Sequence, residues 1–329
     1  MRALLCRELG PVENLVIEDL PDPQPGPGQV VVDVVAAALN FPDTLIIQGK
    51  YQARPELPFS PGAEAAGMVS AVGPGVDQYQ VGDRVIVLGV LSGFGSFREQ
   101  QVVPCTDLVP MPASMDFETA AGFCLTYGTS YYALKDRAAL QPGETLLVLG
   151  AAGGVGLAAV ELGRVMGAQV IAAASTNEKL AVAKAAGASM FINYSAEPLK
   201  QRIKDLTAGR GADVIYDPVG GDLTEQAFRA SAWNGRLLVI GFAAGEIPKI
   251  PLNLALLKSS ALIGVFWGAW AGREPAASAQ NFKELFAMHG EGKLRPLVTQ
   301  VFDLDDYVAA YKTLTERRAQ GKVILRLRD

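Results

Sequence analysis

Apolar residues follow two different patterns along this chain. In the first third, short β-branched runs such as QVVVDVVAAAL and GDRVIVLG alternate with turn sequences such as PDPQPGPG and GPGVDQYQVG. Regular short strands separated by proline and glycine are typical of a small barrel or sandwich. The pattern therefore predicts a β-rich domain over residues 1–118.

The pattern changes near residue 119. Six apolar runs of strand length now alternate with helical patterns: ETLLVLG, AQVIAAAS, ASMFINY, ADVIYDPVG, GRLLVIGF and ALIGVFWG. Continuous apolar runs are typical of buried parallel strands, and the alternation with helices predicts a doubly wound sheet. We expect an α/β domain with a six-stranded parallel sheet over residues 119–268. One more helix, DLDDYVAAYKTLTERRA, and a last strand, GKVILRLRD, follow it.

A glycine-rich loop joins the first of these strands to its helix. The sequence LVLGAAGGVG is a near match to G-x-G-x-x-G, with Ala151, Gly153 and Gly156 at the fixed positions. Gly153 lets the backbone approach a pyrophosphate, and Gly156 lets the helix pack on the strand. Backbone N–H groups at the helix start bind phosphates, so the predicted contacts are Ala152, Gly153, Gly154 and Val155. The alternative is a glycine-rich turn in a protein without a nucleotide.

The end of the second strand indicates which dinucleotide binds. Ser175 lies 19 residues after Gly156, where an acid would hold the ribose of NAD. Serine does not repel a 2′-phosphate, and Lys179 follows one helical turn later. Tyr194 ends the third strand at the same sheet edge. These three residues predict a phosphate pocket and NADPH as the cofactor. Alternatively, Lys179 is an ordinary solvated helix residue.

Composition excludes several classes of protein. Among 329 residues, 50% are hydrophobic and the net charge is -5, with lysine and arginine scattered. A general nucleic-acid surface or an anionic-membrane patch is therefore not expected. The three cysteines have no C-x-x-C spacing, and no apolar run reaches the ~20 residues of a membrane span. We expect a cytoplasmic protein.

Several segments resemble the medium-chain dehydrogenase/reductases across the whole chain. They are LNFPDTLIIQGKY, PGAEAAGMVSAVGPGV, VGDRV, TSYYAL, GETLLVLGAAGGVG, DPVGG and the terminal GKVIL. Within that family the chain is similar to the zinc-free NADPH:quinone oxidoreductase branch, which includes zeta-crystallin. The resemblance implies a GroES-like barrel over 1–118, completed by 269–329, and a Rossmann domain over 119–268.

The resemblance also locates the metal ligands of zinc-dependent members, and this chain departs there. It has Asn40 where those members have a cysteine, and Ala63 where they have a histidine. Leu125, with Cys124 beside it, stands at the third ligand position. Catalytic zinc needs about three His, Cys or carboxylate ligands. Cys124 and Glu64 do not make such a set, so no metal is expected and Cys124 is interpreted as a core thiol.

We expect the reaction cleft between the domains, at the carboxyl ends of the parallel strands. By resemblance, Asn40 and Asp43 lie near the nicotinamide and the acceptor, and Thr129 near the nicotinamide amide. Tyr51 either binds the acceptor, donates a proton, touches the cofactor or only packs. Asp43 is also a candidate helix N-terminal acid. Further expected cofactor contacts are Gly241, Phe242, Ala243, Phe266, Trp267, Gly268 and Lys322.

Without a metal, hydride transfer favours acceptors that are already electrophilic, so quinones or other conjugated carbonyl compounds are the predicted substrates. An enoyl reductase of 2-alkenals, enones or acyl-CoA thioesters is the alternative. A non-catalytic NADPH-binding protein, structural or RNA-binding, is a further one. The apolar run ALIGVFWGAW predicts an edge strand through which a homodimer forms, and Phe266 and Trp267 are also candidates for that interface.

Overall fold

The computed structural model describes residues 1–91 and 93–328, which form two compact units. Unit 1 comprises Met1–Leu125 and Pro296–Asp329, and unit 2 comprises Thr126–Arg295. Unit 2 is therefore an insertion in the sequence of unit 1. The chain passes between the units twice, at Leu125–Thr126 and at Arg295–Pro296.

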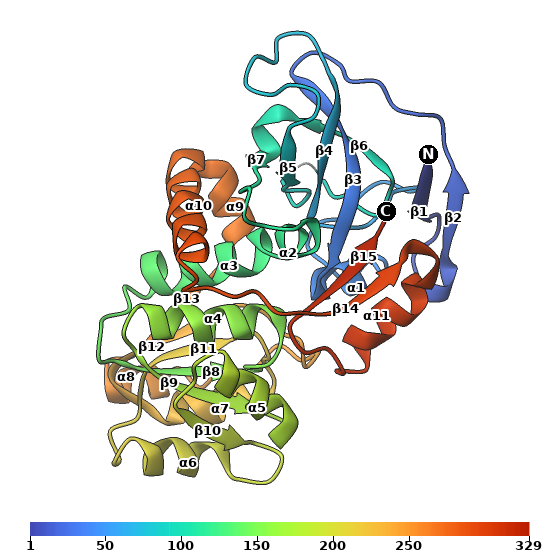
Figure 1. The fold of residues 1–329 in the computed structure, drawn as a ribbon. Coiled ribbons are helices and arrows are strands. Elements are labelled where there is room, and N and C mark those ends of the chain that lie inside the picture. The colour runs from blue at the N-terminus through green and yellow to red at the C-terminus, as the bar shows by residue number, and fades with distance from the viewer. Residues whose placement is uncertain (92, 329) are drawn as a thin grey trace. The chain divides into compact units, whose positions relative to one another are not determined.

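Unit 1 is built around a seven-stranded sheet. Along the sheet the strands follow the order β14-β15-β3-β4-β5-β7, with β6 on β3, and β1 and β2 form a separate pair (Figure 1). The strands are β1 (Arg2–Cys6), β2 (Leu15–Asp19), β3 (Gln29–Leu39), β4 (Ala65–Val72), β5 (Arg84–Val87), β6 (Gln100–Pro104), β7 (Leu108–Pro110), β14 (Val298–Asp303) and β15 (Lys322–Arg326). The helices are α1 (Phe41–Ile46), α2 (Phe117–Ala121), α11 (Tyr307–Thr315) and the short 3-10 turns Val12–Asn14, Cys105–Asp107 and Leu304–Asp306.

The long strand β3 organises unit 1. Its alternate residues Val30, Val32 and Val34 are fully buried in the core, as side chains on one face of a strand are expected to be. β15, from the end of the chain, pairs with the end of β3. The predicted β-rich domain is confirmed, and β14 and β15 from the C-terminal part of the chain belong to its sheet.

Unit 2 contains the predicted parallel sheet. Six strands follow the order β10-β9-β8-β11-β12-β13, and each pairs in parallel with its neighbours. They are β8 (Thr145–Leu149), β9 (Gln169–Ala174), β10 (Met190–Asn193), β11 (Ala212–Asp217), β12 (Ser231–Val239) and β13 (Ala261–Gly264). The strand order reverses at β8, and loops after such strands hold ligands in open α/β sheets.

The helices of unit 2 are α3 (Cys124–Tyr131) with a π-helical segment (Tyr132–Arg137), α4 (Gly154–Val165), α5 (Asn177–Ala185), α6 (Leu199–Leu206), α7 (Asp222–Arg229), α8 (Asn253–Lys258), α9 (Trp267–Arg273) and α10 (Pro275–Gly290). Some of them cover the two faces of the sheet. Leu147 packs in a core with Ile203 of α6 and Phe228 of α7. Its neighbour Leu146 lies against Gly163 of α4. Because successive strand residues point to opposite faces, the two cores lie on opposite sides, and the doubly wound fold is confirmed.

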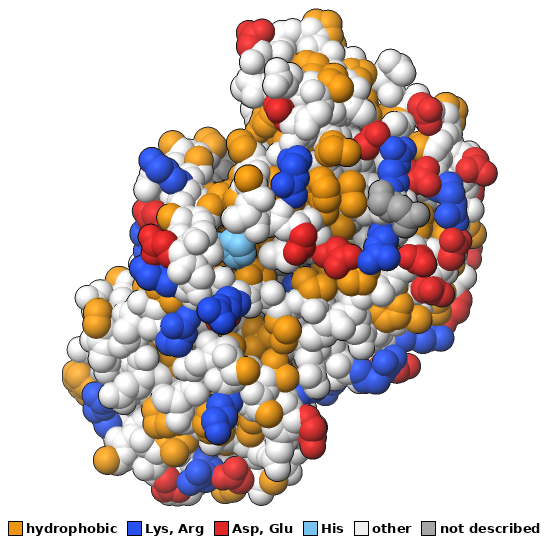
Figure 2. All heavy atoms as spheres, viewed as in Figure 1, with side chains coloured by type: hydrophobic (Ala, Val, Ile, Leu, Met, Phe, Trp, Pro, Cys, Tyr) orange, Lys and Arg blue, Asp and Glu red, His pale blue; other side chains and the backbone are white. Residues whose placement is uncertain are grey.

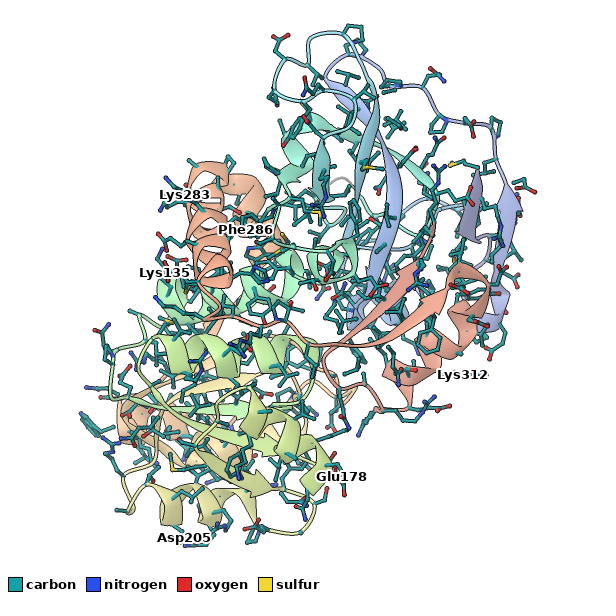
Figure 3. All side chains as sticks on the ribbon, viewed as in Figure 1. Lys135, Glu178, Asp205, Lys283, Phe286 and Lys312 are labelled. Carbon is teal, nitrogen blue, oxygen red and sulfur yellow. The ribbon has the colours of Figure 1, made fainter. Side chains whose placement is uncertain are left out.

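The units divide at residues 126 and 296, whereas the sequence places the boundaries at 119 and 269. The reason is the packing of α9 and α10 on the helix that opens unit 2. The rings of Tyr132 and Trp270 stack at 4.2 Å. Lys135 donates to Glu284 of α10 at 2.6 Å, and Figure 3 shows Lys135 beside that helix.

The sixth strand is shorter than predicted. β13 ends at Gly264, and Trp267 already belongs to α9, where it is buried. Leu262 and Phe266 remain exposed, at 39% and 60%. The apolar run therefore contains a short edge strand and a buried helix start rather than one exposed strand.

Charged side chains of both signs are interspersed on the face shown in Figure 2. Among the described residues, no helix combines the length and apolar character needed to cross a membrane.

Candidate functional site

The dinucleotide loop of unit 2 has the geometry that its spacing predicts. Gly153 precedes the first turn of α4 in an extended conformation, and Gly154 and Val155 open the helix. A Cβ on Gly156 would lie 2.3 Å from the carbonyl oxygen of Gly150, so only glycine fits. The N–H groups of the first helical turn have no acceptor inside the helix and are suited to bind phosphate. Ala152 is buried beneath this turn.

The three residues of the predicted phosphate pocket meet at the end of β9. Lys179 Nζ donates to Ser175 Oγ at 3.4 Å, and both side chains are half-buried. The backbone N–H of Tyr194 donates to Ala174 at 3.1 Å, which places it beside Ser175. A half-buried ammonium and a hydroxyl are suited to bind a phosphate oxygen.

Two further loops lie at the carboxyl ends of β11 and β12. Asp217 is buried, and its Oδ1 accepts from the N–H groups of Val219 and Gly220 at 2.8 and 2.9 Å. This holds the loop DPVGG in place. The Ala243 N–H donates to the Pro218 carbonyl at 3.1 Å. The segment of the predicted contacts Gly241, Phe242 and Ala243 therefore lies against that loop.

The remaining predicted contacts of unit 2 lie on α3 and α9. A Cβ on Gly128 would lie 2.9 Å from the indole of Trp267, so α9 approaches α3 closely. Thr129 and Gly268 are half-exposed, Trp267 is buried and Phe266 is exposed. The structure therefore gives Phe266 and Trp267 different environments, and their contact with the cofactor stays a prediction.

Unit 1 contains a buried polar cluster of Asn40, Asp43, Glu64 and Lys322, brought together from three segments. Lys322 Nζ donates to Asn40 Oδ1 at 2.7 Å, to Glu64 Oε1 at 3.0 Å and to the Leu39 carbonyl at 3.3 Å. Asn40 Nδ2 donates to Glu64 Oε1 at 3.1 Å and to the Ala38 carbonyl at 3.2 Å. The ammonium and the amide therefore both have their partners inside unit 1. The predicted contacts of Asn40 with the acceptor and of Lys322 with the cofactor stay predictions.

Asp43 is the acid of the first turn of α1. It is fully buried, and its Oδ2 accepts from the Asn40 N–H at 2.8 Å. Burial raises the pKa of Asp43 to about 7, although the Asn40 N–H and the Lys322 ammonium favour the charged form. Tyr51 follows α1, packs against the core of unit 1 and is half-buried. Burial and the nearby Asp43 raise the pKa of its hydroxyl, so Tyr51 is neutral at physiological pH.

Glu64 connects the cluster to α3. Its Oε2 accepts from the Leu125 N–H at 2.9 Å, in the first turn of the helix that also carries Thr129. A carboxylate at a helix N-terminus satisfies a free donor and interacts favourably with the helix dipole.

Both halves of the chain match dehydrogenase families. Residues 26–113 match the alcohol dehydrogenase GroES-like domain, and residues 154–284 match the zinc-binding dehydrogenase family. The chain is 42% identical over 327 residues to a quinone oxidoreductase-like protein 2 homolog of Nematostella vectensis, covering 98% of this chain and 88% of that protein. The chain belongs to the quinone oxidoreductase branch of the medium-chain dehydrogenase/reductases. It is an oxidoreductase.

Solved structures of this family have the same fold. The quinone oxidoreductase of Escherichia coli, complexed with NADPH, has a TM-score of 0.91 at 31% identity, over 99% of this chain and 100% of that one. The CurK enoyl reductase has a TM-score of 0.89 at 29% identity, over 99% of each chain.

One of the two matching families is described as zinc-binding. A zinc ion does not fit the residues of this quinone oxidoreductase-like chain. The acceptor atoms Asn40 Oδ1 and Glu64 Oε1 both bind the Lys322 ammonium, and a second cation there would be repelled. Ala63 offers no ligand atom, and Cys124 is a buried thiol whose pKa is raised well above its usual value by burial and by Glu64. Among residues 1–91 and 93–328, no group of three His, Cys, Asp or Glu side chains could hold a metal.

The sequence interpretation missed two residues of unit 2 and the role of Glu64. Asp217 ends a buried strand, and Glu161 stands in the apolar part of α4, where it accepts from Tyr127 Oη at 2.7 Å. An acid among apolar residues of a predicted helix or strand is a visible signal, because buried acids need partners. The partners of Glu161, however, come from distant segments, whereas those of Asp217 lie in the loop that follows it.

Proposed function

We propose that this chain is an NADPH-dependent reductase that transfers hydride to quinones or other conjugated carbonyl acceptors without a metal. The observation that carries the proposal is the Lys322 ammonium, which binds Asn40, at the position of one zinc ligand, and Glu64, next to the position of another. Without a Lewis acid, an acceptor that delocalises charge within itself is favoured.

The cofactor side rests on unit 2. The N–H groups at the start of α4 would bind the pyrophosphate, and Ser175, Lys179 and Tyr194 would bind the 2′-phosphate. NADPH in the related Escherichia coli structure supports this. When bound, NADPH supplies the hydride. The chain contributes positioning, because hydride transfer needs the reacting atoms ~3–3.5 Å apart.

On the acceptor side, Tyr51 is the one predicted catalytic side chain that is half-exposed, and its neutral hydroxyl can donate a hydrogen bond to an acceptor oxygen. Asn40 and Asp43 are buried and bonded within the cluster. We assign them to supporting roles in the same reaction.

The test is NADPH consumption with 1,2-naphthoquinone and 9,10-phenanthrenequinone, with ethanol and benzyl alcohol oxidation as controls. We expect turnover of the quinones and none of the alcohols. Efficient alcohol oxidation with no conjugated acceptor reduced would disprove the proposal.

An enoyl reductase is the second candidate, supported by the similarity to the CurK enoyl reductase. A 2-alkenal and crotonyl-CoA in the same assay distinguish the two. A kcat/KM for either that exceeds those of the quinones would favour the second candidate.

We also propose that two copies associate through β13. This strand is the last of its sheet, and the side chains of Leu262 and Phe266 beside it are exposed. Light scattering at micromolar concentration should give twice the 34.7 kDa of one chain, and a 34.7 kDa species would reject the dimer.

A further inference from the structure

The Lys322–Glu64 ion pair differs in burial from other ion pairs of the described residues. Its two side chains are 7% and 0% exposed, whereas the Lys312–Glu13 pair, for example, is 45% and 53% exposed. Burying two charges is costly unless geometry and further hydrogen bonds compensate. The pair joins β15, at the end of the chain, to the segment before β4, so it indicates a specific role rather than surface stabilisation.

We propose that Lys322 is a positioning residue of the site: its buried ammonium fixes the side chains of Asn40 and Glu64, and through them the first turns of α1 and α3. The kinetic test of this inference rests on the proposed function, because it measures the reduction of a quinone. The inference concerns a residue whose ammonium binds Asn40, Glu64 and the Leu39 carbonyl within unit 1.

The first branch of this arrangement runs through Asn40. Lys322 donates to the amide oxygen, and the amide nitrogen donates to Glu64 and to the Ala38 carbonyl. Lys322 thereby sets which way the amide faces, since a flipped amide would place its NH₂ against the ammonium. Asn40 opens α1, whose Asp43 binds the Asn40 N–H, and Tyr51 follows that helix.

The second branch runs through Glu64. One of its oxygens binds Lys322, and the other accepts from the Leu125 N–H at 2.9 Å. The two bonds hold the carboxylate in one orientation. Without the cation, the carboxylate would be buried and uncompensated, and its bond to the start of α3 would weaken.

The stem of Lys322 is also held. A Cβ on Gly122 would lie 3.0 Å from both Cγ and Cε of Lys322, so the lysine chain runs directly against the backbone before α3. The ammonium therefore has little freedom. Gly122→Ala displaces the stem while leaving both charges in place, and Gly122 has a φ of -98° that alanine readily adopts.

The charge of Asp43 gives a separate readout. Lys322 favours its ionised form, whereas Glu64 opposes it. The groups that face Asp43 are Lys322 from β15, Glu64 before β4, Tyr51 after α1 and Tyr311 from α11. Removing the Lys322 charge alone should therefore move the titration of Asp43 to higher pH.

The experiment compares Lys322→Met, the double variant Glu64→Gln/Lys322→Met and Gly122→Ala, with Lys312→Met as control. Lys312 is an exposed lysine on α11 (Figure 3). The readouts are Tm, the Kd of NADPH, kcat and KM with a quinone, and hydrogen exchange of the peptides containing residues 40–46 and 122–128. Tm as a function of pH reports Asp43.

We expect Lys322→Met to lower Tm and the double variant to recover much of it, because no buried charge is left unpaired. In the double variant kcat should remain ~10-fold to 100-fold below wild type, with the NADPH Kd within about threefold. Exchange should be faster in both peptides. In Lys322→Met, the decrease of Tm with rising pH should extend to a higher pH than in wild type, because Asp43 keeps its proton longer. Gly122→Ala should lower kcat with a small change in Tm, and Lys312→Met should change nothing.

If kcat and exchange in the double variant recover together with Tm, Lys322 has only a structural role and the proposal is wrong. A folded Lys322→Met with wild-type kcat also overturns it. Where Lys322→Met does not fold, the double variant and Gly122→Ala decide. If wild type reduces no acceptor, the proposed function fails instead, and exchange and the pH dependence of Tm still decide the role of Lys322.

Discussion

The two units build their candidate sites in opposite ways. In unit 2, the loop after β8 uses backbone N–H groups and closely packed glycines, all within ten residues of sequence. In unit 1, the buried polar cluster uses side chains that lie up to 282 residues apart. The first kind of site depends on local conformation, and the second depends on the completed fold.

This difference determines how each site responds to substitution. A site made of backbone groups and glycines has almost no side-chain atoms that a substitution could remove. It is therefore disrupted by substitutions that add volume. A side-chain cluster is disrupted by removing a charge, because the remaining partners are buried without compensation. The predictions below test this contrast, beginning with the largest effect.

Gly156→Ala should have the largest effect. The new Cβ would lie 2.3 Å from the Gly150 carbonyl oxygen, which forces α4 away from β8. We expect a loss of stability above the ~1–3 kcal/mol usual for overpacking, with NADPH binding abolished. Denaturant unfolding and fluorescence titration measure both.

The control for that substitution is Gly272→Ala in α9, where a Cβ would meet no atom within 4 Å. It should leave unfolding and NADPH binding unchanged or raise stability slightly. Equal losses at both positions would contradict the close-packing argument.

Asp43→Asn should change how stability depends on pH. The pKa of Asp43 is about 7 in the folded protein and 3.8 in the reference state, so the folded protein keeps a proton that the unfolded chain releases. This contribution is complete below pH 4 and is lost as pH rises through about 7. It amounts to at most ~4 kcal/mol.

The asparagine variant cannot titrate, so its free energy of unfolding should fall less between pH 5 and pH 8 than that of wild type. Asp222→Asn, at an exposed position, is the control and should follow wild type. Parallel curves for wild type and Asp43→Asn would show that Asp43 does not titrate in this range.

Ser175→Asp should reverse the cofactor preference. A carboxylate beside Lys179 would repel the 2′-phosphate and compete for the ammonium, which lies 3.4 Å from Ser175 Oγ. We expect a loss of ~1.5–3 kcal/mol for NADPH, roughly tenfold or more in Kd, with NADH binding unchanged or improved. Wild type that binds NADH as tightly as NADPH would refute the phosphate pocket.

Tyr51→Phe should have the smallest effect. It removes one neutral hydroxyl, so we expect kcat to fall about 10-fold while the Kd of NADPH stays constant. Tyr79→Phe is a matched control, because that hydroxyl donates to the Leu108 carbonyl at 3.1 Å elsewhere in unit 1. An unchanged kcat for Tyr51→Phe would assign Tyr51 to packing.

The same contrast explains what the sequence could predict. The six strands of unit 2 and the strands β3, β5 and β15 of unit 1 follow from apolar periodicity, whereas β1, β2, β7 and β14 were not predicted. Gly156 and Ser175 follow from spacing along the chain. Glu64 and Glu161 could be recognised only as buried acids, because Lys322 and Arg295, which bind them, are far away in sequence. The end of β13 was missed because its apolar run continues into Trp267, which the fold buries against Gly128.

Glu161 has a consequence for the independence of unit 2. Its carboxylate accepts from Tyr127 Oη at 2.7 Å and from the Arg295 N–H at 3.1 Å. Tyr127 stands next to the first residue of the inserted segment and Arg295 is its last, so the Glu161 side chain links the two ends of the segment. Domains whose ends lie close together tolerate excision and insertion. Residues 126–295 should therefore behave as a transferable module: expressed alone, or grafted between two neighbouring strands of another barrel, the segment should retain its own fold.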